Sequence, residues 1–149
     1  MRRELADGFE LDDDRGRIDL QAVHGFISGE SYWGRGRSRE LVKRTVEGSQ
    51  RVVGLYRGED QVGFARAVTD GTTVAYLADV YVLEPYRGRG LGIELVREML
   101  DGGRRAGPSE IHWLLHTADA AGLYSRLGFV DGPARYPLME RPRGYDSSR

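Results

Sequence analysis

The segment from Arg87 to Gly92 has residue types that suit the binding of a phosphate group. It stands between an apolar run that ends at Leu83 and a stretch with apolar residues at helical spacing that begins at Leu91. The first N–H groups of a helix lack intrahelical partners, and the helix dipole is positive there. Glycine lets a phosphate chain approach the backbone, and arginine adds charge-assisted hydrogen bonds. The segment therefore predicts an anion site at the start of a helix.

Other phosphate-binding loops fit this segment less well. A P-loop ends in Gly-Lys-Ser/Thr, which is absent, and the dinucleotide-binding fingerprint requires a glycine where Ile93 stands. A string of glycine and arginine is also a common solvated turn, so its position between a strand and a helix carries the phosphate interpretation. These differences disfavour nucleoside triphosphates and NAD as ligands.

The apolar pattern predicts a mixed α/β domain. Helical spacing predicts helices over residues 19–29, 38–46, 91–102 and 119–127, with Asp19, Ser38 and Asp119 as N-caps, Gly102-Gly103 ending the third helix and Gly128 as a left-handed C-cap. Strands are expected over residues 9–14, 51–57, 61–69, 73–83 and 111–116. Both alternating sets of the run 73–83 are largely apolar, with Leu77 and Tyr81 in the same set. This run therefore predicts a central strand that is covered on both faces.

The composition excludes several classes of protein. A chain of 149 residues with 40% hydrophobic content suits one domain, and we expect it over residues 1–149, with an ordered core at about 5–141 and a flexible tail at 142–149. The net charge of -1 supplies no field that would attract nucleic acid or an anionic membrane. No apolar stretch approaches the ~20 residues of a membrane span, and no apolar leader follows Met1. We expect a cytoplasmic protein without nucleic-acid or membrane partners.

Cysteine and histidine offer little chemistry in this chain. There is no Cys, so the chain has no disulfide, no thiolate nucleophile and no cysteine zinc site. His112 and His116 lie at even spacing without a carboxylate cluster beside them, which favours packing or solvation. No metal is therefore expected.

Several segments in a fixed order resemble the GNAT superfamily of N-acetyltransferases. Its motif, Arg/Gln-x-x-Gly-x-Gly/Ala at the start of a helix after a long central strand, is matched at every defined position by residues 87–92. Residues 81–86 and 123–129 also look like the family, and residues 32–37, 62–70 and 75–80 resemble its small single-domain members. The resemblance implies the acyl-CoA N-acyltransferase fold, a central and largely antiparallel twisted sheet with a splayed parallel strand pair, flanked by about four helices.

This resemblance implies an enzyme that transfers the acetyl group of acetyl-CoA to a primary amine by direct transfer in a ternary complex, since no Cys can carry the acetyl group. It implies that the backbone of Val80, Tyr81 and Val82 pairs with the pantetheine arm. The pyrophosphate is then expected at Arg87, Gly88, Arg89, Gly90, Leu91 and Gly92. We also place Asp119 and Tyr124 among the residues that contact the cofactor.

Three residues are candidates for proton transfer. Tyr124 resembles the family tyrosine that protonates the sulfur of coenzyme A, and its alternative is a core aromatic residue. Asp79 lies within an apolar strand, where burial would raise the pKa of its carboxyl toward the range of a base. Its alternative is a structural carboxylate bonded to a backbone N–H or to Arg66. Glu84, at the strand end, is the second candidate base.

The acceptor side is less defined by sequence. Tyr32 and Trp33 occupy the region that forms the acceptor pocket in related enzymes, where aromatic walls suit an amine through cation-π contact, although they equally suit a covering of the core. We place Arg66 with them. The acceptor, a small molecule or a peptide, stays open, as does a homodimer. A noncatalytic acyl-CoA-binding sensor or interaction domain is the alternative function, and an RNA-binding module is disfavoured by the charge.

Overall fold

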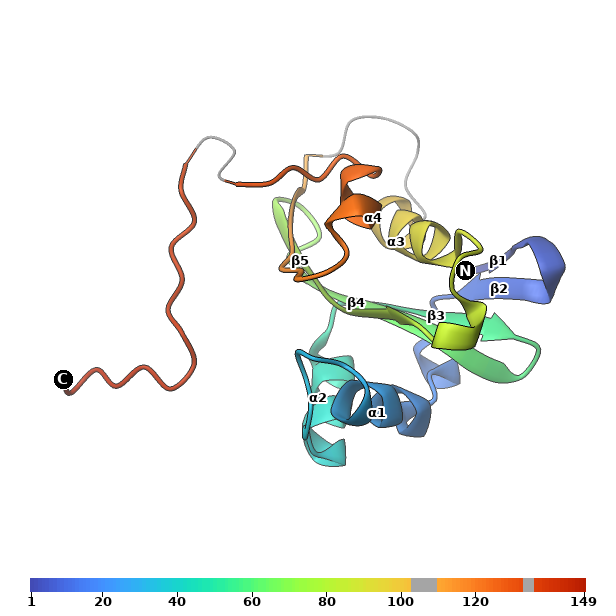
Figure 1. Ribbon diagram of the computed structural model, residues 1–149, viewed down its shortest axis with the longest axis horizontal. Helices are drawn as coiled ribbons and strands as arrows, with labels where there is room; N and C mark the ends of the chain where they lie inside the picture. The colour runs from blue at the N-terminus through green and yellow to red at the C-terminus, as the bar shows by residue number, and fades with distance from the viewer. Residues whose placement is uncertain (103–109, 133–135) are drawn as a thin grey trace.

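The computed structural model describes residues 1–102, 110–132 and 136–149 (Figure 1). These residues form one sheet with the strand order β1-β2-β3-β4-β5-β6. Its strands are β1 (Arg2–Glu4), β2 (Phe9–Asp12), β3 (Arg51–Arg57), β4 (Asp60–Thr69), β5 (Val74–Val82) and β6 (His112–Leu114). Neighbouring strands are antiparallel except for β5 and β6, which are parallel. The predicted mixed α/β fold with a largely antiparallel sheet and one parallel pair is confirmed.

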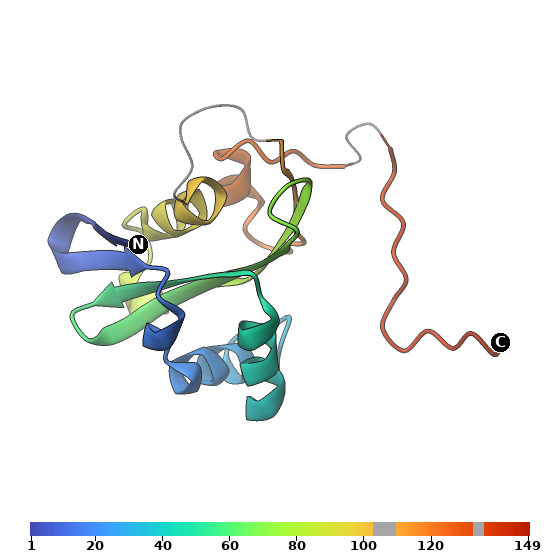
Figure 2. The same cartoon turned by 180° about the vertical axis from the view of Figure 1, so that it is seen from behind.

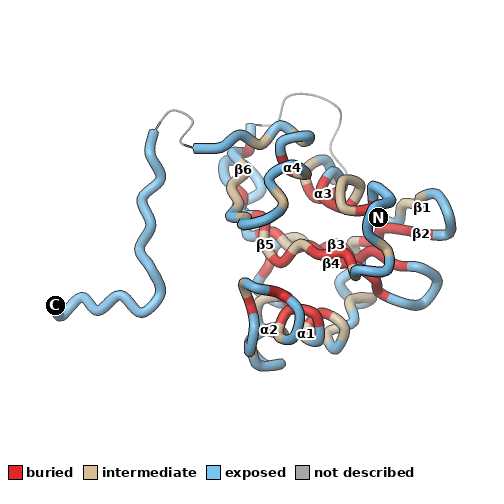
Figure 3. The backbone as a smooth tube through the Cα atoms, viewed as in Figure 1, coloured by how far each residue is buried: buried red, intermediate tan, exposed pale blue. Residues whose placement is uncertain are grey.

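The helices of the described residues cover the two faces of this sheet (Figures 1 and 2). One face carries α1 (Leu20–Gly29) and α2 (Arg39–Gly48), and the other carries α3 (Leu91–Asp101) and α4 (Ala121–Ser125). Short 3-10 helices lie at η1 (Ala6–Gly8), η2 (Arg15–Arg17) and η3 (Glu84–Tyr86). The core accordingly has two parts, one under α1 and α2 and one under α3, with buried strand residues between them (Figure 3). No helix of the described residues has the length and apolar character that a membrane crossing requires.

Two helices begin at side-chain caps that the sequence predicts. The Asp19 carboxylate accepts a hydrogen bond from Ala22 N at 3.0 Å, and Ser38 Oγ accepts one from Leu41 N at 3.1 Å. Helix α3 differs, because its N-cap is Gly90, which has no side chain to offer. The first N–H groups of α3 are therefore left for another partner.

The start of α4 differs from the prediction. The N-cap is Ala120 rather than Asp119, and the Asp119 side chain makes no capping hydrogen bond. Thr117 Oγ1 instead accepts from Ala120 N at 3.0 Å, so a hydroxyl earlier in the chain forms the turn that leads into the helix. The helix is also shorter than predicted, although Gly128 does adopt the predicted left-handed conformation with φ at 89°.

Strand β5 contains an irregularity that the sequence pattern hides. The register with β4 shifts between Phe64 and Arg66, and Asp79 has a left-handed backbone with φ at 52°. Leu77, before this bulge, packs in the core under α3, whereas Tyr81, after it, packs under α1 and α2. The prediction that both share one face is wrong, because one extra residue reverses the side that each later side chain faces.

Two other predictions about strands need correction. Val74 and Tyr76 are 44% and 37% exposed, so β5 is covered on both faces only toward its end at Val82. Strand β1 was not predicted, because Arg2–Glu4 has no apolar alternation; this edge strand is held by backbone pairing and by the ion pair of Arg2 with Glu10.

The ends of the third helix and of the chain complete the description. Helix α3 ends at Asp101 with Gly102 as its C-cap, and Gly103 lies outside the described residues. Residues 136–149 are all exposed and form neither helix nor strand, and they extend away from the sheet (Figure 1). The boundaries of the ordered core and of a flexible tail stay a prediction.

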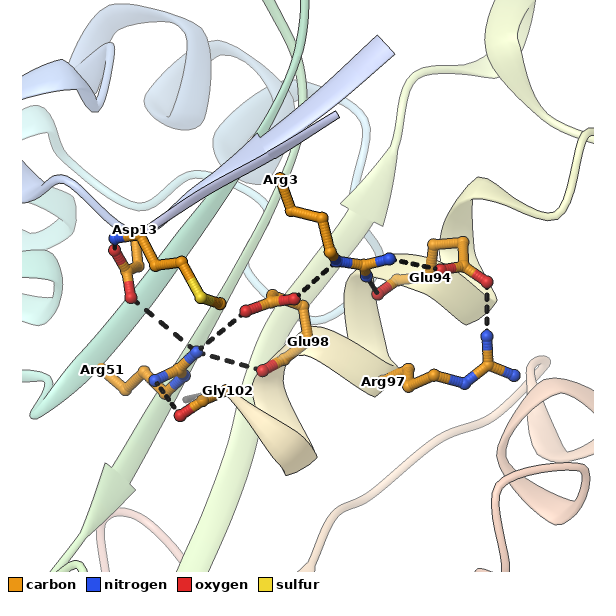
Figure 4. Close-up of polar contacts among 8 residues, drawn as sticks. Arg3, Asp13, Arg51, Glu94, Arg97, Glu98 and Gly102 are labelled. Carbon is orange, nitrogen blue, oxygen red and sulfur yellow. Dashed lines mark hydrogen bonds and ion pairs between the residues drawn. The ribbon is translucent and has the colours of Figure 1, made fainter. Parts of the chain in front are cut away.

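A network of charged groups holds α3 against β1 and β3 (Figure 4). Arg3 Nε donates to Glu98 Oε2 at 2.8 Å, and Arg3 Nη1 donates to Glu94 Oε2 at 2.9 Å. Arg51 donates to Glu98 O at 3.0 Å and to Gly102 O at 3.3 Å, at the C-terminal end of the helix. A cation at this end complements the helix dipole. The chain's own side chains therefore satisfy one end of α3, but not the other.

Candidate active site

A cleft of about 350 Å³ lies at the N-terminal end of α3, next to α4. Gly88 and Gly90 have φ values of +77° and +76°, which L side chains rarely adopt, and a Cβ added at either would meet nothing within 4 Å. The backbone is therefore open to a ligand at both positions. The cleft is lined by Val82, Arg87, Gly88, Gly90, Leu91, Gly92, Ile93, Gly122, Leu123 and Arg126. Most of the predicted phosphate segment is among these residues, whereas Arg89 is exposed and does not line the cleft.

Positive charge gathers at the cleft. Arg87 Nε donates to Val82 O at 2.8 Å, which holds this guanidinium at the cleft while its terminal nitrogens remain available to donate. Within the described residues, neither Arg87 nor Arg126 forms an ion pair with a carboxylate, in contrast to Arg37 and Arg66. Sequence reasoning assigned no role to Arg126. Arg126 stands four residues after Gly122 and therefore shares its face of the helix. This spacing indicates a place in the cleft only when the orientation of α4 is known.

The far end of β5 presents its backbone toward the side on which β6 lies. Leu83 N donates to Val62 O of β4 at 2.9 Å. In an antiparallel ladder the adjacent residue directs its N–H and C=O to the opposite edge, so Val82 faces away from β4. By the same alternation, Val80 does too. β5 pairs with β6 only over Val74 to Tyr76, so among the described residues no strand pairs with this edge beyond that point.

Tyr81 lies between these two residues, so its backbone N–H and C=O face β4 rather than the open edge. Its ring stacks on Phe26 of α1, with centroids 4.0 Å apart and planes 11° from parallel. The side chain is thus part of the core under α1 and α2, where burial raises the pKa of its phenol. The Tyr81 side chain therefore holds β5 against α1 and does not point toward the cleft.

Tyr124 lies on α4, 9% exposed, with its ring edge against Phe129 at 5.7 Å. Burial raises the pKa of its phenol to about 12, so the hydroxyl carries its proton at neutral pH. No hydrogen bond from Tyr124 Oη to another described residue is present. Because Leu123 and Arg126 line the cleft, this proton lies on the helix that borders it.

Asp79 is the centre of a second cluster, on the other face of the sheet. Its side chain is 4% exposed, and its oxygens accept from Arg66 Nε at 2.6 Å, Trp33 Nε1 at 2.8 Å and Arg37 Nη1 at 3.1 Å. Burial acts to raise the pKa of this carboxyl, but Arg66, Arg37 and Trp33 together hold it below its ordinary value. The expectation of a raised pKa is wrong, because two guanidinium groups pair with the carboxylate.

The loop between α1 and α2, residues 30–38, connects this cluster to the segment after β6. We call it the aromatic loop. The rings of Tyr32 and Trp33 meet edge to face at 5.0 Å, and Tyr32 Oη accepts from Ala118 N at 2.8 Å. The loop therefore contacts both β5 and the chain that leads into α4. Of the predicted acceptor residues, Trp33 and Arg66 bind the Asp79 carboxylate, whereas the exposed Tyr32 contacts Trp33 and Ala118.

Glu84 and Asp119 belong neither to the lining of the cleft nor to the Asp79 cluster, as is also true of Arg89. Glu84 is exposed in η3, and Asp119 is exposed before α4 and does not line the cleft. Among the described residues, no group of three or more His, Asp or Glu is arranged to hold a metal ion, and His116 lies beyond the end of β6 at Leu114. His116 Nδ1 instead lies 2.6 Å from Tyr76 Oη, at hydrogen-bond distance.

Comparison with known proteins identifies the family of this chain. Residues 48–131 match the family described as the acetyltransferase (GNAT) domain. A crystal structure from Xanthomonas campestris pv. campestris, described as belonging to the GNAT family, has a TM-score of 0.79 and 33% identity, over 90% of this chain and 92% of that one. The chain therefore belongs to the GNAT acetyltransferase family, as its sequence motifs predict.

More distant relatives agree with this assignment. A probable acetyltransferase from Staphylococcus aureus, 20% identical, shares the fold with a TM-score of 0.71 over 90% of this chain and 98% of that one. The uncharacterized N-acetyltransferase ycf52 of Pyropia yezoensis is 31% identical over 101 residues, which are 65% of this chain and 58% of that protein. A protein of Gibberella zeae that is named a putative acetyltransferase is 37% identical over 76 residues, which are 48% of this chain and 41% of that protein. The chain thus spans about half the length of these curated relatives.

Proposed function

We propose that the protein is an N-acetyltransferase that binds acetyl-CoA and transfers its acetyl group to a primary amine in a ternary complex. The cleft at the start of α3 carries this proposal, because it combines an open glycine backbone, two arginines without a carboxylate partner among the described residues, and a bordering helix that bears Tyr124. Membership of the GNAT family supports acyl transfer. The donor, the acceptor and the roles of individual residues are the proposal.

The residues at the cleft fit the pyrophosphate of coenzyme A. The first N–H groups of α3 have no side-chain cap, and Gly88 and Gly90 leave room for close approach. Arg87 and Arg126 line the cleft, and the exposed Arg89 adds a third cation in the same loop. The outward N–H and C=O groups of Val82 and Val80 suit the amides of a pantetheine arm, which would pair like an added strand. When bound, acetyl-CoA supplies the acetyl group as a thioester.

Amide formation requires that the sulfur gains a proton and that the amine loses one. We assign the first proton to Tyr124 Oη, because this hydroxyl is protonated at neutral pH and lies on the helix that borders the cleft. For the second, Glu84 or a water chain stays the candidate. Asp79 suits this task poorly, because a carboxylate with a lowered pKa and occupied oxygens accepts a proton weakly. The absence of cysteine favours direct transfer.

The test measures thiol release from acetyl-CoA in the presence of spermidine, glucosamine, L-lysine, a peptide with a free N-terminus and an N-blocked peptide with one lysine. Release that depends on one of these amines supports the proposal. Calorimetric titration with coenzyme A separates the alternatives. Binding without turnover on any amine would favour a noncatalytic acyl-CoA-binding domain, and absence of binding would contradict both functions.

A further inference from the structure

The aromatic loop, residues 30–38, is anchored to the sheet at a single buried carboxylate. Trp33 Nε1 lies 2.8 Å from Asp79 Oδ1, and Arg37 Nη1 lies 3.1 Å from Oδ1 and 3.2 Å from Oδ2. Arg66 Nε of β4 binds Oδ2 from the sheet side at 2.6 Å. Two donors from the loop and one from the neighbouring strand therefore meet at one residue of β5.

The same residue forms the bulge of β5. Asp79 has a φ of 52°, and a non-glycine residue persists in this left-handed region only where its surroundings hold it there. The bulge immediately precedes Val80, whose backbone we assign to the pantetheine arm. It also places Leu77 and Tyr81 on opposite faces. The contacts of the Asp79 carboxylate thus tie the shape of the β5 edge to the position of the aromatic loop.

The geometry leaves the carboxylate no part in proton transfer. Arg37 bridges both oxygens, and each oxygen has a further donor, Trp33 on one and Arg66 on the other. The side chain is 4% exposed, so water reaches it poorly. A general base needs an oxygen that can take up a proton from the amine or from a water bound to it. These contacts instead suit a structural anchor.

We propose that Asp79 is a positioning residue, which fixes the aromatic loop as the acceptor-side wall and holds the bulge that presents Val80 to the donor. It acts through Trp33 and Arg37. The proposal rests on the proposed N-acetyltransferase function, but the anchor itself is a property of the folded chain. It can therefore be tested both with and without an amine substrate.

The first test needs no activity. Amide hydrogen exchange of residues 30–38 is compared in the wild type, Asp79→Asn, Trp33→Phe and Glu59→Gln, the last being an exposed carboxylate-to-amide control. We expect about tenfold faster exchange of the loop in Asp79→Asn, as for one lost charge-assisted hydrogen bond, and a smaller increase in Trp33→Phe. Glu59→Gln should match the wild type. Unchanged exchange of the loop in both Asp79→Asn and Trp33→Phe would overturn the anchor.

Tryptophan emission gives a second readout on the same loop. The chain has two Trp residues, so the substitution Trp113→Phe leaves Trp33 as the sole emitter. In that background, Asp79→Asn should shift the emission of Trp33 to longer wavelength, because its ring loses a buried partner. Asp79→Gly keeps the left-handed backbone without strain and removes the carboxylate, so it should give the same shift. A shift in neither variant would contradict the anchor.

Kinetics then distinguish positioning from base catalysis. With the amine of the panel that turns over fastest, Asp79→Asn should raise KM for the amine about tenfold, keep kcat within about threefold and leave the pH profile unchanged. The effects of Asp79→Asn and Trp33→Phe should be less than multiplicative in the double variant. A fall in kcat of about 100-fold with loss of one limb of the pH profile would make Asp79 the base and overturn the proposal.

These outcomes separate the anchor from the proposed function. If the wild type turns over no amine, the proposed function fails while exchange and emission still decide the anchor. If Asp79→Asn does not fold, Trp33→Phe tests the anchor by exchange, since it removes one hydrogen bond and keeps an aromatic ring.

Discussion

The cleft at the start of α3 and the Asp79 cluster, which lie on opposite faces of the sheet, differ in how their charged groups are paired. At the cleft beside α3, Arg87 and Arg126 have no carboxylate partner among the described residues, and the helix lacks a side-chain cap. At Asp79, on the other face, one carboxylate meets two arginines and an indole N–H with little exposure. Arginines without a carboxylate partner can bind an anionic ligand, whereas a carboxylate that is fully paired with arginines stabilises the local backbone. This contrast supports the proposal that the first site binds the donor and that the second supports the aromatic loop.

The largest expected effect concerns the proton on α4. Tyr124→Phe should lower kcat by about 10²- to 10⁴-fold, because it removes the proposed acid and retains the ring that packs on Phe129. Affinity for coenzyme A by calorimetry should stay within about twofold of the wild type. Since the pKa of Tyr124 is about 12, the wild-type rate should show no loss from its ionisation between pH 7 and 10. An undiminished kcat in the variant would remove the acid role.

Loss of the Asp79 carboxylate should lower the stability of the protein. Asp79→Asn should destabilise the fold by about 3 kcal/mol at pH 7, because it leaves two buried guanidinium groups without their anion. Since the folded-state pKa of Asp79 is lowered, its stabilisation is present above its ordinary pKa and is lost as pH falls through the folded-state value. Urea unfolding at pH 7 and at pH 3 should therefore show a smaller difference between wild type and variant at pH 3. An equal difference at both values would contradict the ion pairs.

Loss of an arginine at the cleft should lower the affinity for coenzyme A rather than the stability of the protein. Arg87→Ala should weaken coenzyme A binding about 10- to 100-fold, the equivalent of about 1.5 to 3 kcal/mol for a charge-assisted hydrogen bond. Arg97→Ala is the matched control, because Arg97 lies on α3 but pairs with Glu94, away from the cleft. Calorimetric titration of both variants checks this. Equal affinities would show that the loop does not hold the pyrophosphate.

The smallest expected effect compares two glycines. Gly90→Ala should destabilise the protein by about 1 kcal/mol, because a Cβ is disfavoured at its φ of +76°. Gly25→Ala, within the exposed face of α1, should stabilise it by about 0.5 to 1 kcal/mol, since glycine is a poor helix former. Thermal unfolding of the two variants gives the sign of each change. Changes of the same sign would contradict the left-handed turn before α3.

Most features set by local chemistry were predictable from the sequence, although the predicted cap Asp119 does not begin α4. The caps Asp19 and Ser38 and the left-handed Gly128 depend on residues within a single turn, and the structure has all three. The glycine-arginine segment was placed correctly at the start of α3 for the same reason. The hydrogen bond from Arg87 Nε to Val82 O also joins residues that are close in the sequence.

Features set by distant residues were not predictable. The pKa of Asp79 depends on Arg37 and Trp33, 42 and 46 positions away, so burial alone gave the wrong direction. The bulge of β5 depends on its pairing with β4, which apolar alternation does not report. Arg126 joins the cleft only because α4 turns that face toward α3. Strand β1 forms because an open edge of β2 is available.

Helix α3 has a side-chain hydrogen-bond partner at its C-terminal end but no side-chain cap at its N-terminal end. Arg51 donates to Glu98 O and to the carbonyl of the C-cap residue Gly102, whereas Gly90 leaves the first N–H groups of the helix without a side-chain partner. An anion bound at the N-terminal end of α3 would accept hydrogen bonds from these N–H groups. Because it binds only the folded chain, its binding would add to the free energy of unfolding. A ligand at about 100 times its Kd stabilises a folded protein by about 2.7 kcal/mol. The melting temperature of this protein should thus rise with coenzyme A concentration, with α3 as the element that gains most protection.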